Sequence, residues 1–273
     1  MQRPAVATVS TRPDHGRSWG VPSYPETQLV RDLPGAGQRG ELLAHFQPQL
    51  DLATGRVTTV EALARWHHPE FGSIPPIEFI AVAETHGLVT ELGDHILTLG
   101  LRQIARWRSA GLTLDLAVNM SPNQLVEGLW ASVDAELQRW GLEPIVLTLE
   151  LTETEPIADV SSVIACLTEL RELGCGVSID DFGAGYTTLD QLRSLPATEL
   201  KLDPSIMRGP RDIALERLAP VMREARRFDL LVVAEGIETQ EHLELATELG
   251  CDRAQGYLIG APMDADKLER TLT

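Results

Sequence analysis

The sequence is poor in cysteine, which narrows the kinds of site that it can build. Cysteine occurs three times in 273 residues, as Cys166, Cys175 and Cys251, with no Cys-x-x-Cys pair. An odd number of cysteines, each in or beside an apolar stretch, indicates reduced thiols that pack in the interior rather than disulfides or metal ligands.

Long apolar runs and basic residues are also scarce. No stretch approaches the roughly 20 apolar residues of a transmembrane helix, and the N-terminus has no apolar segment of the signal-peptide type. We therefore expect a cytoplasmic protein without membrane insertion. Against 23 Lys and Arg the chain has 40 Asp and Glu, a net charge of −17, which repels DNA, RNA and anionic membranes. If the substrate is an anion, bound cations must attract it locally.

The first 40 residues differ in composition from the rest. They contain five prolines and many Gly, Ser and Thr, without sustained periodicity. We predict that residues 1–40 form an N-terminal extension, largely irregular or flexible, with a short helix at Glu26 to Leu33 and room for a regulatory partner. The main folded domain is then expected to span residues 41–273.

From residue 41 onward, strand and helix patterns alternate. The runs 44–52 and 57–66 flank a turn too short for a crossover helix, which predicts an antiparallel pair. Further strands are expected at 114–119, 145–151, 176–179, 199–202, 230–234 and 253–258. Helices are expected at 77–86, 89–109, 122–140, 157–173, 187–194, 211–227, 239–249 and from 264 onward. This order predicts an α/β fold, a TIM-like (β/α)8 barrel with the first strand antiparallel to the rest.

Polar side chains follow the apolar runs repeatedly. They are Glu61, Asn119, Glu150, Asp180 with Asp181, and Glu235, and a sixth run contains Lys201 near its end. Any one of these acids could be a helix cap, but the carboxyl ends of barrel strands meet at one mouth, where active sites lie. Carboxylate and amide oxygens suit Mg²⁺ or Mn²⁺, and the set contains no Cys or His to favour zinc.

The pair of adjacent aspartates indicates more than one ion. Asp180 and Asp181 could bridge two cations, which together activate a water and stabilise a leaving oxygen at phosphorus. Lys201 would orient that water or neutralise developing charge. By contrast, we interpret His67 and His68, which precede Pro69, as loop residues rather than ligands.

The stretch Glu61-Ala62-Leu63-Ala64-Arg65-Trp66 is similar to the signature of the EAL domain family, whose active members are metal-dependent phosphodiesterases that linearise cyclic di-GMP. Stretches that resemble the other motifs of the family occur in the family's order over residues 41–272. They are Phe46-Gln47-Pro48, Gly72 to Glu84, Asn119-Met120-Ser121, Glu150 to Glu153, Asp180 to Tyr186, Lys201-Leu202-Asp203, Ala234 to Glu238 and Gln255-Gly256-Tyr257.

The resemblance implies a role for each position. Glu61, Asn119, Glu150 and Asp180 would hold one Mg²⁺ or Mn²⁺ ion, and Asp180, Asp181 and Glu235 the second. The catalytic residues would be Glu61, Lys201 at the attacking water and Glu235 as proton acceptor. Substrate contacts would come from Gln47, Leu63, Arg65, Asp203 and Gln255, while Glu153 would brace the loop that couples the site to a homodimer interface.

Three functions are consistent with these residues. The first is a phosphodiesterase that converts cyclic di-GMP to linear pGpG with two ions and a water, and that Ca²⁺ inhibits. The alternative is a catalytically inactive cyclic di-GMP receptor, since some members of the family have lost their ligands. The third is a protein–protein regulator without a nucleotide. All ligand positions are retained here, which favours the enzyme, although Gln49-Leu50, Ala184 and Thr187-Thr188 depart from the family pattern.

Overall fold

The computed structural model describes residues 24–151, 160–183 and 194–273. The expectations for Glu153, for Ala184 and Thr187-Thr188, and for a helix at 187–194 lie outside these residues. The described strands are β1 (Leu42–Asp51), β2 (Arg56–His68), β3 (Gly72–Ile74), β4 (Asp115–Met120), β5 (Leu147–Leu151), β6 (Gly176–Phe182), β7 (Glu199–Leu202), β8 (Leu231–Ala234) and β9 (Arg253–Gln255). The helices are α1 (Glu26–Asp32), α2 (Pro76–Thr85), α3 (Val89–Ser109), α4 (Leu129–Trp140), α5 (Val160–Leu173), α7 (Pro204–Met207), α8 (Arg211–Arg227), α9 (Gln240–Leu249) and α10 (Ala265–Leu272).

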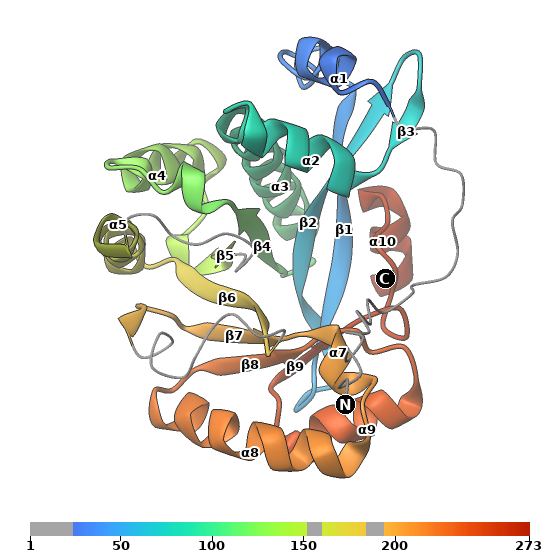
Figure 1. Cartoon of the computed structure of the whole chain (residues 1–273), viewed down its shortest axis with the longest axis vertical. Helices are drawn as coiled ribbons and strands as arrows, with labels where there is room; N and C mark the ends of the chain where they lie inside the picture. The colour runs from blue at the N-terminus through green and yellow to red at the C-terminus, as the bar shows by residue number, and fades with distance from the viewer. Residues whose placement is uncertain (1–23, 152–159, 184–193) are drawn as a thin grey trace, which may run out of the picture.

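The strands close into a barrel. In the described part of the chain the order is β1-β9-β8-β7-β6-β5-β4-β2, and β1 pairs with β2 to complete the circle. β1 runs antiparallel to β2 and β9, whereas the other neighbouring strands of the barrel are parallel. The short strand β3 pairs antiparallel with the last three residues of β2. Helices lie outside the strands, with α10 beside β1 (Figure 1). The predicted TIM-like barrel with an antiparallel first strand is confirmed.

The reversal of β1 follows from the turn that connects it to β2. The carboxylate of Asp51 accepts hydrogen bonds from the backbone N–H and the hydroxyl of Thr54, both at 2.7 Å, and Gly55 has φ +67°. An aspartate that bonds two or three residues ahead closes a tight turn, and a four-residue connection can join only antiparallel strands.

Helix α3 shows how a sequence pattern produces the outer layer. Its buried residues Leu92, Ile96, Gly100, Ile104 and Trp107 recur at intervals of four or three, so they form one face against the strands. Gly100 lets this face approach closely, since a Cβ there would lie 2.8 Å from the Leu116 side chain of β4.

Several predicted boundaries are wrong. Ile145 is 76% exposed and belongs to a 3-10 turn (Pro144–Val146), so β5 begins only at Leu147. The helix predicted from 122 to 140 is interrupted, because Gly128 takes φ +81° before α4 starts. His68 lies at the end of β2 rather than in a loop. The prediction placed Ile145 in a strand because it is apolar, and it missed the interruption of the helix because the left-handed conformation of Gly128 is not visible in the sequence.

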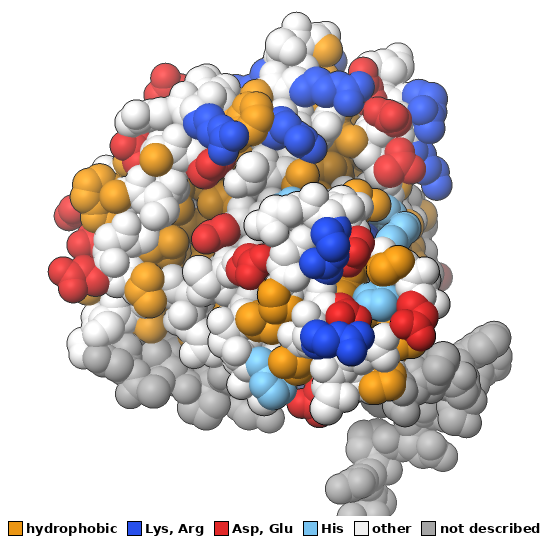
Figure 2. Space-filling view, turned by 90° about the horizontal axis from the view of Figure 1, so that it is seen from above, with side chains coloured by type: hydrophobic (Ala, Val, Ile, Leu, Met, Phe, Trp, Pro, Cys, Tyr) orange, Lys and Arg blue, Asp and Glu red, His pale blue; other side chains and the backbone are white. Residues whose placement is uncertain are grey.

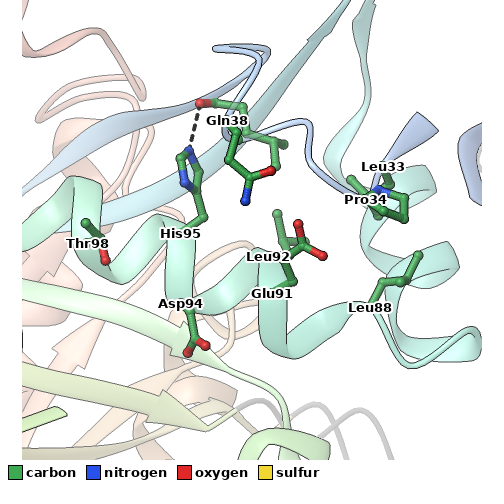
Figure 3. Close-up of a pocket in the computed structure, with 11 residues that line it drawn as sticks. Leu33, Pro34, Gln38, Leu88, Glu91, Leu92, Asp94, His95 and Thr98 are labelled. Carbon is green, nitrogen blue, oxygen red and sulfur yellow. Dashed lines mark hydrogen bonds between the residues drawn. The ribbon is translucent and has the colours of Figure 1, made fainter. Parts of the chain in front are cut away.

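Residues 24–40 pack against the barrel domain. α1 confirms the predicted short helix, and Leu29 and Leu33 are buried. The Gly35 N–H donates to the Glu91 carboxylate at 2.8 Å, and His95 Nε2 lies 3.3 Å from the carbonyl of Leu42, beside a pocket between this segment and α3 (Figure 3). The boundary at residue 40 stays a prediction.

No helix among the described residues is long and apolar enough to cross a membrane. Acidic, basic and hydrophobic side chains are interspersed over the face shown in Figure 2.

Candidate active site

The predicted site residues lie at or near the carboxyl ends of the parallel strands. Asn119, Glu150 and Lys201 are the next-to-last residues of β4, β5 and β7, and Glu235 directly follows β8. Glu61 differs, because it lies in the middle of β2. The parallel pairing of β2 with β4 nevertheless ends at Ala62, and the residues of β2 after Ala62 pair only with the antiparallel strands β1 and β3. Glu61 therefore still lies near the end of the parallel part of β2.

Lys201 is at the centre of this region and is only 1% exposed. Its Nζ lies 2.8 Å from Glu235, 3.1 Å from Glu150, 3.3 Å from Asp180 and 3.6 Å from Glu61. These contacts join β2, β5, β6, β7 and the residue after β8 around one ammonium group. One positive charge faces four carboxylates, so the cluster carries excess negative charge in a buried place.

The electrostatics follow from this imbalance. Burial and the neighbouring Glu61 charge raise the pKa of Glu150 well above its ordinary value. Burial raises the pKa of Glu235 to about 8, although Lys201 opposes the shift. Burial would lower the pKa of Lys201, but the surrounding carboxylates raise it well above the usual lysine value. Lys201 is therefore a permanent cation.

A second acidic group shares Asp180 and Glu235 with the first and adds Asp181. Asp180, Asp181 and Glu235 each offer a carboxylate oxygen, and these oxygens all lie within 4.8 Å of one another. Asp181 has φ +55°, an uncommon conformation for a non-glycine residue, and its N–H donates to the Asp180 carboxylate at 2.9 Å. The local turn thereby directs two adjacent carboxylates toward Glu235. Burial and the Asp180 charge raise the pKa of Asp181.

Two side-chain amides, those of Asn119 and Gln255, fix the position of the Glu61 carboxylate. Asn119 Nδ2 donates to Glu61 Oε1 and Gln255 Nε2 donates to Glu61 Oε2, both at 2.5 Å. With Lys201, these donors outweigh the effect of burial, so the pKa of Glu61 is lowered. In contrast, Glu150 Oε1 is buried without a hydrogen-bond partner among the described residues. A buried, unpartnered carboxylate oxygen beside excess negative charge fits a bound cation.

Two pockets adjoin the acidic cluster, and Glu61 and Leu63 line both. One, of about 310 Å³, also contains Arg65 and Asn119, and its walls are largely apolar. The other, of about 300 Å³, contains Gln47, Gln255 and Glu235. Four of the predicted substrate residues, Gln47, Leu63, Arg65 and Gln255, thus line a cavity beside the predicted ligands.

Other predicted residues lie elsewhere. Asp203 caps the short helix α7, and its carboxylate accepts from the Ser205 N–H at 2.8 Å; it lines neither pocket. The sequence interpretation also missed Tyr257 as a lining residue, although it belongs to a quoted motif, and Arg208, whose guanidinium pairs with Glu238 at 2.7 Å. Gln49 was missed as well: it is fully buried beside Gln255, and the alternation Gln47-Pro48-Gln49 in a strand was its available signal.

A TIM-like barrel with a lysine and a cluster of acids at the ends of its parallel strands defines an α/β barrel protein with a candidate acidic metal site. The model of the EAL domain matches residues 30–262, and the chain belongs to this family.

Known relatives and structures agree with this membership. The chain is 39% identical over 249 residues to a bifunctional diguanylate cyclase/cyclic di-GMP phosphodiesterase, MucR of Pseudomonas aeruginosa, covering 89% of this chain and 36% of that protein. It is 36% identical over 243 residues to the cyclic di-GMP phosphodiesterase RocR of the same species, covering 87% of this chain and 62% of that protein. The chain therefore spans less than two thirds of either relative.

Among solved structures, the PaMucR phosphodiesterase in complex with c-di-GMP aligns with a TM-score of 0.80 at 39% identity, covering 88% of this chain and 99% of that chain. The EAL domain of Mycobacterium smegmatis DcpA aligns with a TM-score of 0.70 at 33% identity, covering 85% and 96%.

Proposed function

We propose that this chain is a metal-dependent phosphodiesterase that hydrolyses one phosphodiester bond of cyclic di-GMP to give linear pGpG. The observation that carries the proposal is the buried Lys201 ammonium within 3.6 Å of four carboxylates, next to the group formed by Asp180, Asp181 and Glu235. Relatives at 36–39% identity that are named cyclic di-GMP phosphodiesterases support the choice of substrate.

The donor set fits two hard cations. Glu61, Asn119, Glu150 and Asp180 would hold one ion, and Asp180, Asp181 and Glu235 the other. All these donors are carboxylates or an amide, as Mg²⁺ and Mn²⁺ prefer. When bound, such ions supply an activated water and stabilise negative charge on phosphoryl oxygens. They would also compensate the excess negative charge that one lysine leaves.

Lys201 and Glu235 would handle the proton and the developing charge. Burial raises the pKa of Glu235 to about 8 without a metal, and a bound cation would favour the carboxylate form, which is the form that can accept a proton. Lys201 stays protonated and holds its Nζ 2.8 Å from Glu235 Oε1, which keeps that carboxylate oriented. The same ammonium places a fixed positive charge where negative charge grows on the phosphate.

The two pockets that meet at Glu61 and Leu63 offer a separate cavity to each half of a dinucleotide. Arg65 lines one and Arg208 the other, so each offers a guanidinium to a phosphate or a base edge. Since the chain carries a net charge of −17, these arginines and the bound cations would provide the local attraction for an anionic dinucleotide.

The test is to incubate the purified chain with cyclic di-GMP and Mg²⁺ or Mn²⁺ and to separate the nucleotides by chromatography. We expect pGpG from the wild type and from Glu241→Ala, an exposed acid of α9 that serves as matched control, and none from Glu61→Ala. Binding of the nucleotide without pGpG would favour a receptor. Neither binding nor product would favour a protein–protein regulator.

The proposal includes a homodimer, a cytoplasmic location and a regulatory contact through residues 1–40. Light scattering on the purified chain tests the dimer, and deletion of residues 1–23 tests whether that segment changes turnover.

A further inference from the structure

A glutamine lies behind the amide that holds Glu61. Gln49 is in β1, two residues after Gln47, so both side chains point to the same face of the strand. It is 0% exposed, and its backbone lies opposite Thr59 of β2 on one side and Gln255 of β9 on the other. A fully buried amide in a barrel interior requires hydrogen-bond partners, because desolvation of an unpaired polar group is costly.

The hydrogen bonds of this amide have a fixed direction. A carboxylate only accepts, so Gln255 must direct its nitrogen at Glu61 Oε2, which it does at 2.5 Å. That nitrogen also donates to Gln47 Oε1 at 3.2 Å. The oxygen of Gln255 consequently faces the opposite way, where Gln49 Nε2 donates to it at 2.9 Å. The chain of donors therefore runs from Gln49 through Gln255 to Glu61.

The two ends of a glutamine amide have nearly the same shape, so packing alone does not select its orientation. If Gln255 turned over, its oxygen would face the Glu61 carboxylate and repel it. The donor from Gln49 disfavours that rotation, because the turned amide would place an N–H against the N–H of Gln49, and both amides would have to turn together to avoid this clash. Glu61 would then lose one of its two amide donors, leaving only Asn119.

Gln49 also has an energetic disadvantage that a packing residue would avoid. Its Oε1 is buried without a hydrogen-bond partner among the described residues, and the desolvation of such an unpaired oxygen is unfavourable. An aliphatic side chain, as the family resemblance leads one to expect here, would fill the same space without that cost.

We propose that Gln49 is a positioning residue, which locks the amide of Gln255 in the orientation that holds Glu61 ready to bind a divalent cation. The inference rests on the proposed function only in taking Glu61 as a metal ligand. Gln49 itself lines neither of the two pockets and is not among the proposed metal ligands.

The test measures Mn²⁺ binding to the metal-free full chain without nucleotide, by electron paramagnetic resonance. Gln49→Met keeps the length of the side chain and removes the donor. We expect about tenfold weaker Mn²⁺ binding, as is usual for residues that orient a ligand. Gln103→Met in α3 is the matched control, since the Gln103 side-chain nitrogen is also buried but has no partner among the described residues; its Mn²⁺ binding should equal that of the wild type.

A second measurement separates positioning from general loosening of the barrel. If Gln49 acts through Gln255, the change Gln49→Met should weaken Mn²⁺ binding in the wild type but have little effect in a Gln255→Met background. Equal weakening in both backgrounds would overturn the inference, as would unchanged binding by Gln49→Met. If Gln49→Met does not fold, as judged by thermal unfolding, Gln49→Leu replaces it in the same comparison.

The outcomes also separate this inference from the proposed function. A wild type that binds Mn²⁺ but yields no pGpG would contradict the phosphodiesterase and leave the Gln49 comparison valid. A wild type that yields pGpG while Gln49→Met binds Mn²⁺ normally would contradict only the role of Gln49. A wild type that binds no Mn²⁺ would overturn both.

Discussion

Lys201 Nζ lies 2.8 Å from Glu235 Oε1, and this contact links β7 to the residue that follows β8. The pair is buried, so its strength depends on the surrounding charges rather than on solvent. Three further carboxylates face the same ammonium, and the lysine therefore acts as an internal counter-ion for the whole cluster.

Removal of this counter-ion should destabilise the metal-free protein. In Lys201→Met, four buried carboxylates lose their common cation, and breaking a buried ion pair from one side costs about 3–5 kcal/mol. We expect a loss of that size in the free energy of unfolding, measured with denaturant in EDTA. In a separate assay with Mg²⁺ or Mn²⁺, Lys201→Met should form no pGpG. Mn²⁺ should restore part of the stability, because a divalent cation compensates the same charges.

Lys267 is the matched control for this change. It is the second of the two lysines in the chain and is exposed on α10. Lys267→Met should change the free energy of unfolding by less than about 0.5 kcal/mol. Equal stability of Lys201→Met and Lys267→Met in EDTA would contradict the role of Lys201.

Glu235 should make the stability of the metal-free protein depend on pH. Its pKa is raised to about 8 in the folded state, mainly by burial, so the folded protein keeps a proton that the unfolded chain releases above about pH 4.3. Stability from this group is therefore complete below about pH 4.3 and is lost as pH rises toward 8, by up to about 1.4 kcal/mol per pH unit. Thermal unfolding in EDTA between pH 5 and 9 measures the slope.

The comparison for that slope is Glu235→Gln, which keeps the shape and removes the titration. Its stability should fall less steeply with pH than that of the wild type. Parallel curves for the two proteins would show that Glu235 does not carry this dependence.

The sequence predicted the barrel and the position of the acids because both follow from short-range patterns. An apolar run that ends in Glu150 or Lys201 is visible without a structure, and strand ends of a barrel converge by geometry. Which side chains meet is a property of the closed barrel, so the four partners of Lys201 and the bond between Gln49 and Gln255 were not predictable. Ile145 shows the opposite error, since its apolar character indicated a strand position that the chain exposes to solvent.

Gly256 should tolerate no side chain. It follows Gln255, and a Cβ there would lie 2.3 Å from the backbone N and O of Ile237, which follows Glu235 by two residues. Because backbone atoms cannot rotate away, Gly256→Ala must displace one of the two segments that carry site residues. We expect at least about 2 kcal/mol of lost stability, within the range for overpacking, together with strongly reduced pGpG formation.

Gly209→Ala provides the comparison, since its Cβ would make only ordinary contacts, the nearest at 3.5 Å. Stability should then change by less than about 1 kcal/mol, in line with the Gly-to-Ala effect at permissive sites. If Gly256→Ala were as stable and as active as Gly209→Ala, the close approach at Ile237 would not constrain the site.

The three cysteines should react slowly in the folded protein. All are free and buried, and burial raises the pKa of Cys175 and of Cys251 to about 12 and also raises that of Cys166. At pH 8 only about one in ten thousand of the Cys175 and Cys251 thiols would be the reactive thiolate. Mass spectrometry after iodoacetamide treatment should show little labelling of the native chain and three labels after denaturation. Rapid native labelling would contradict the interpretation of these residues as interior packing groups.

Ca²⁺ should inhibit turnover in competition with Mg²⁺ or Mn²⁺. The oxygens of Asp180, Asp181 and Glu235 lie within 4.8 Å of one another and would hold one of the proposed ions, and Mg²⁺ requires oxygens at about 2.1 Å in near-ideal octahedral geometry. Ca²⁺ takes six to eight oxygens at about 2.3–2.6 Å, so it would bind the acids yet displace them from the geometry that orients a water. We expect pGpG formation in Mn²⁺ to fall as Ca²⁺ is added and to recover with excess Mn²⁺, measured by chromatography at constant ionic strength, with NaCl replacing CaCl₂ in the control. Full turnover with Ca²⁺ as the sole divalent ion would mean that the reaction does not need the tighter coordination.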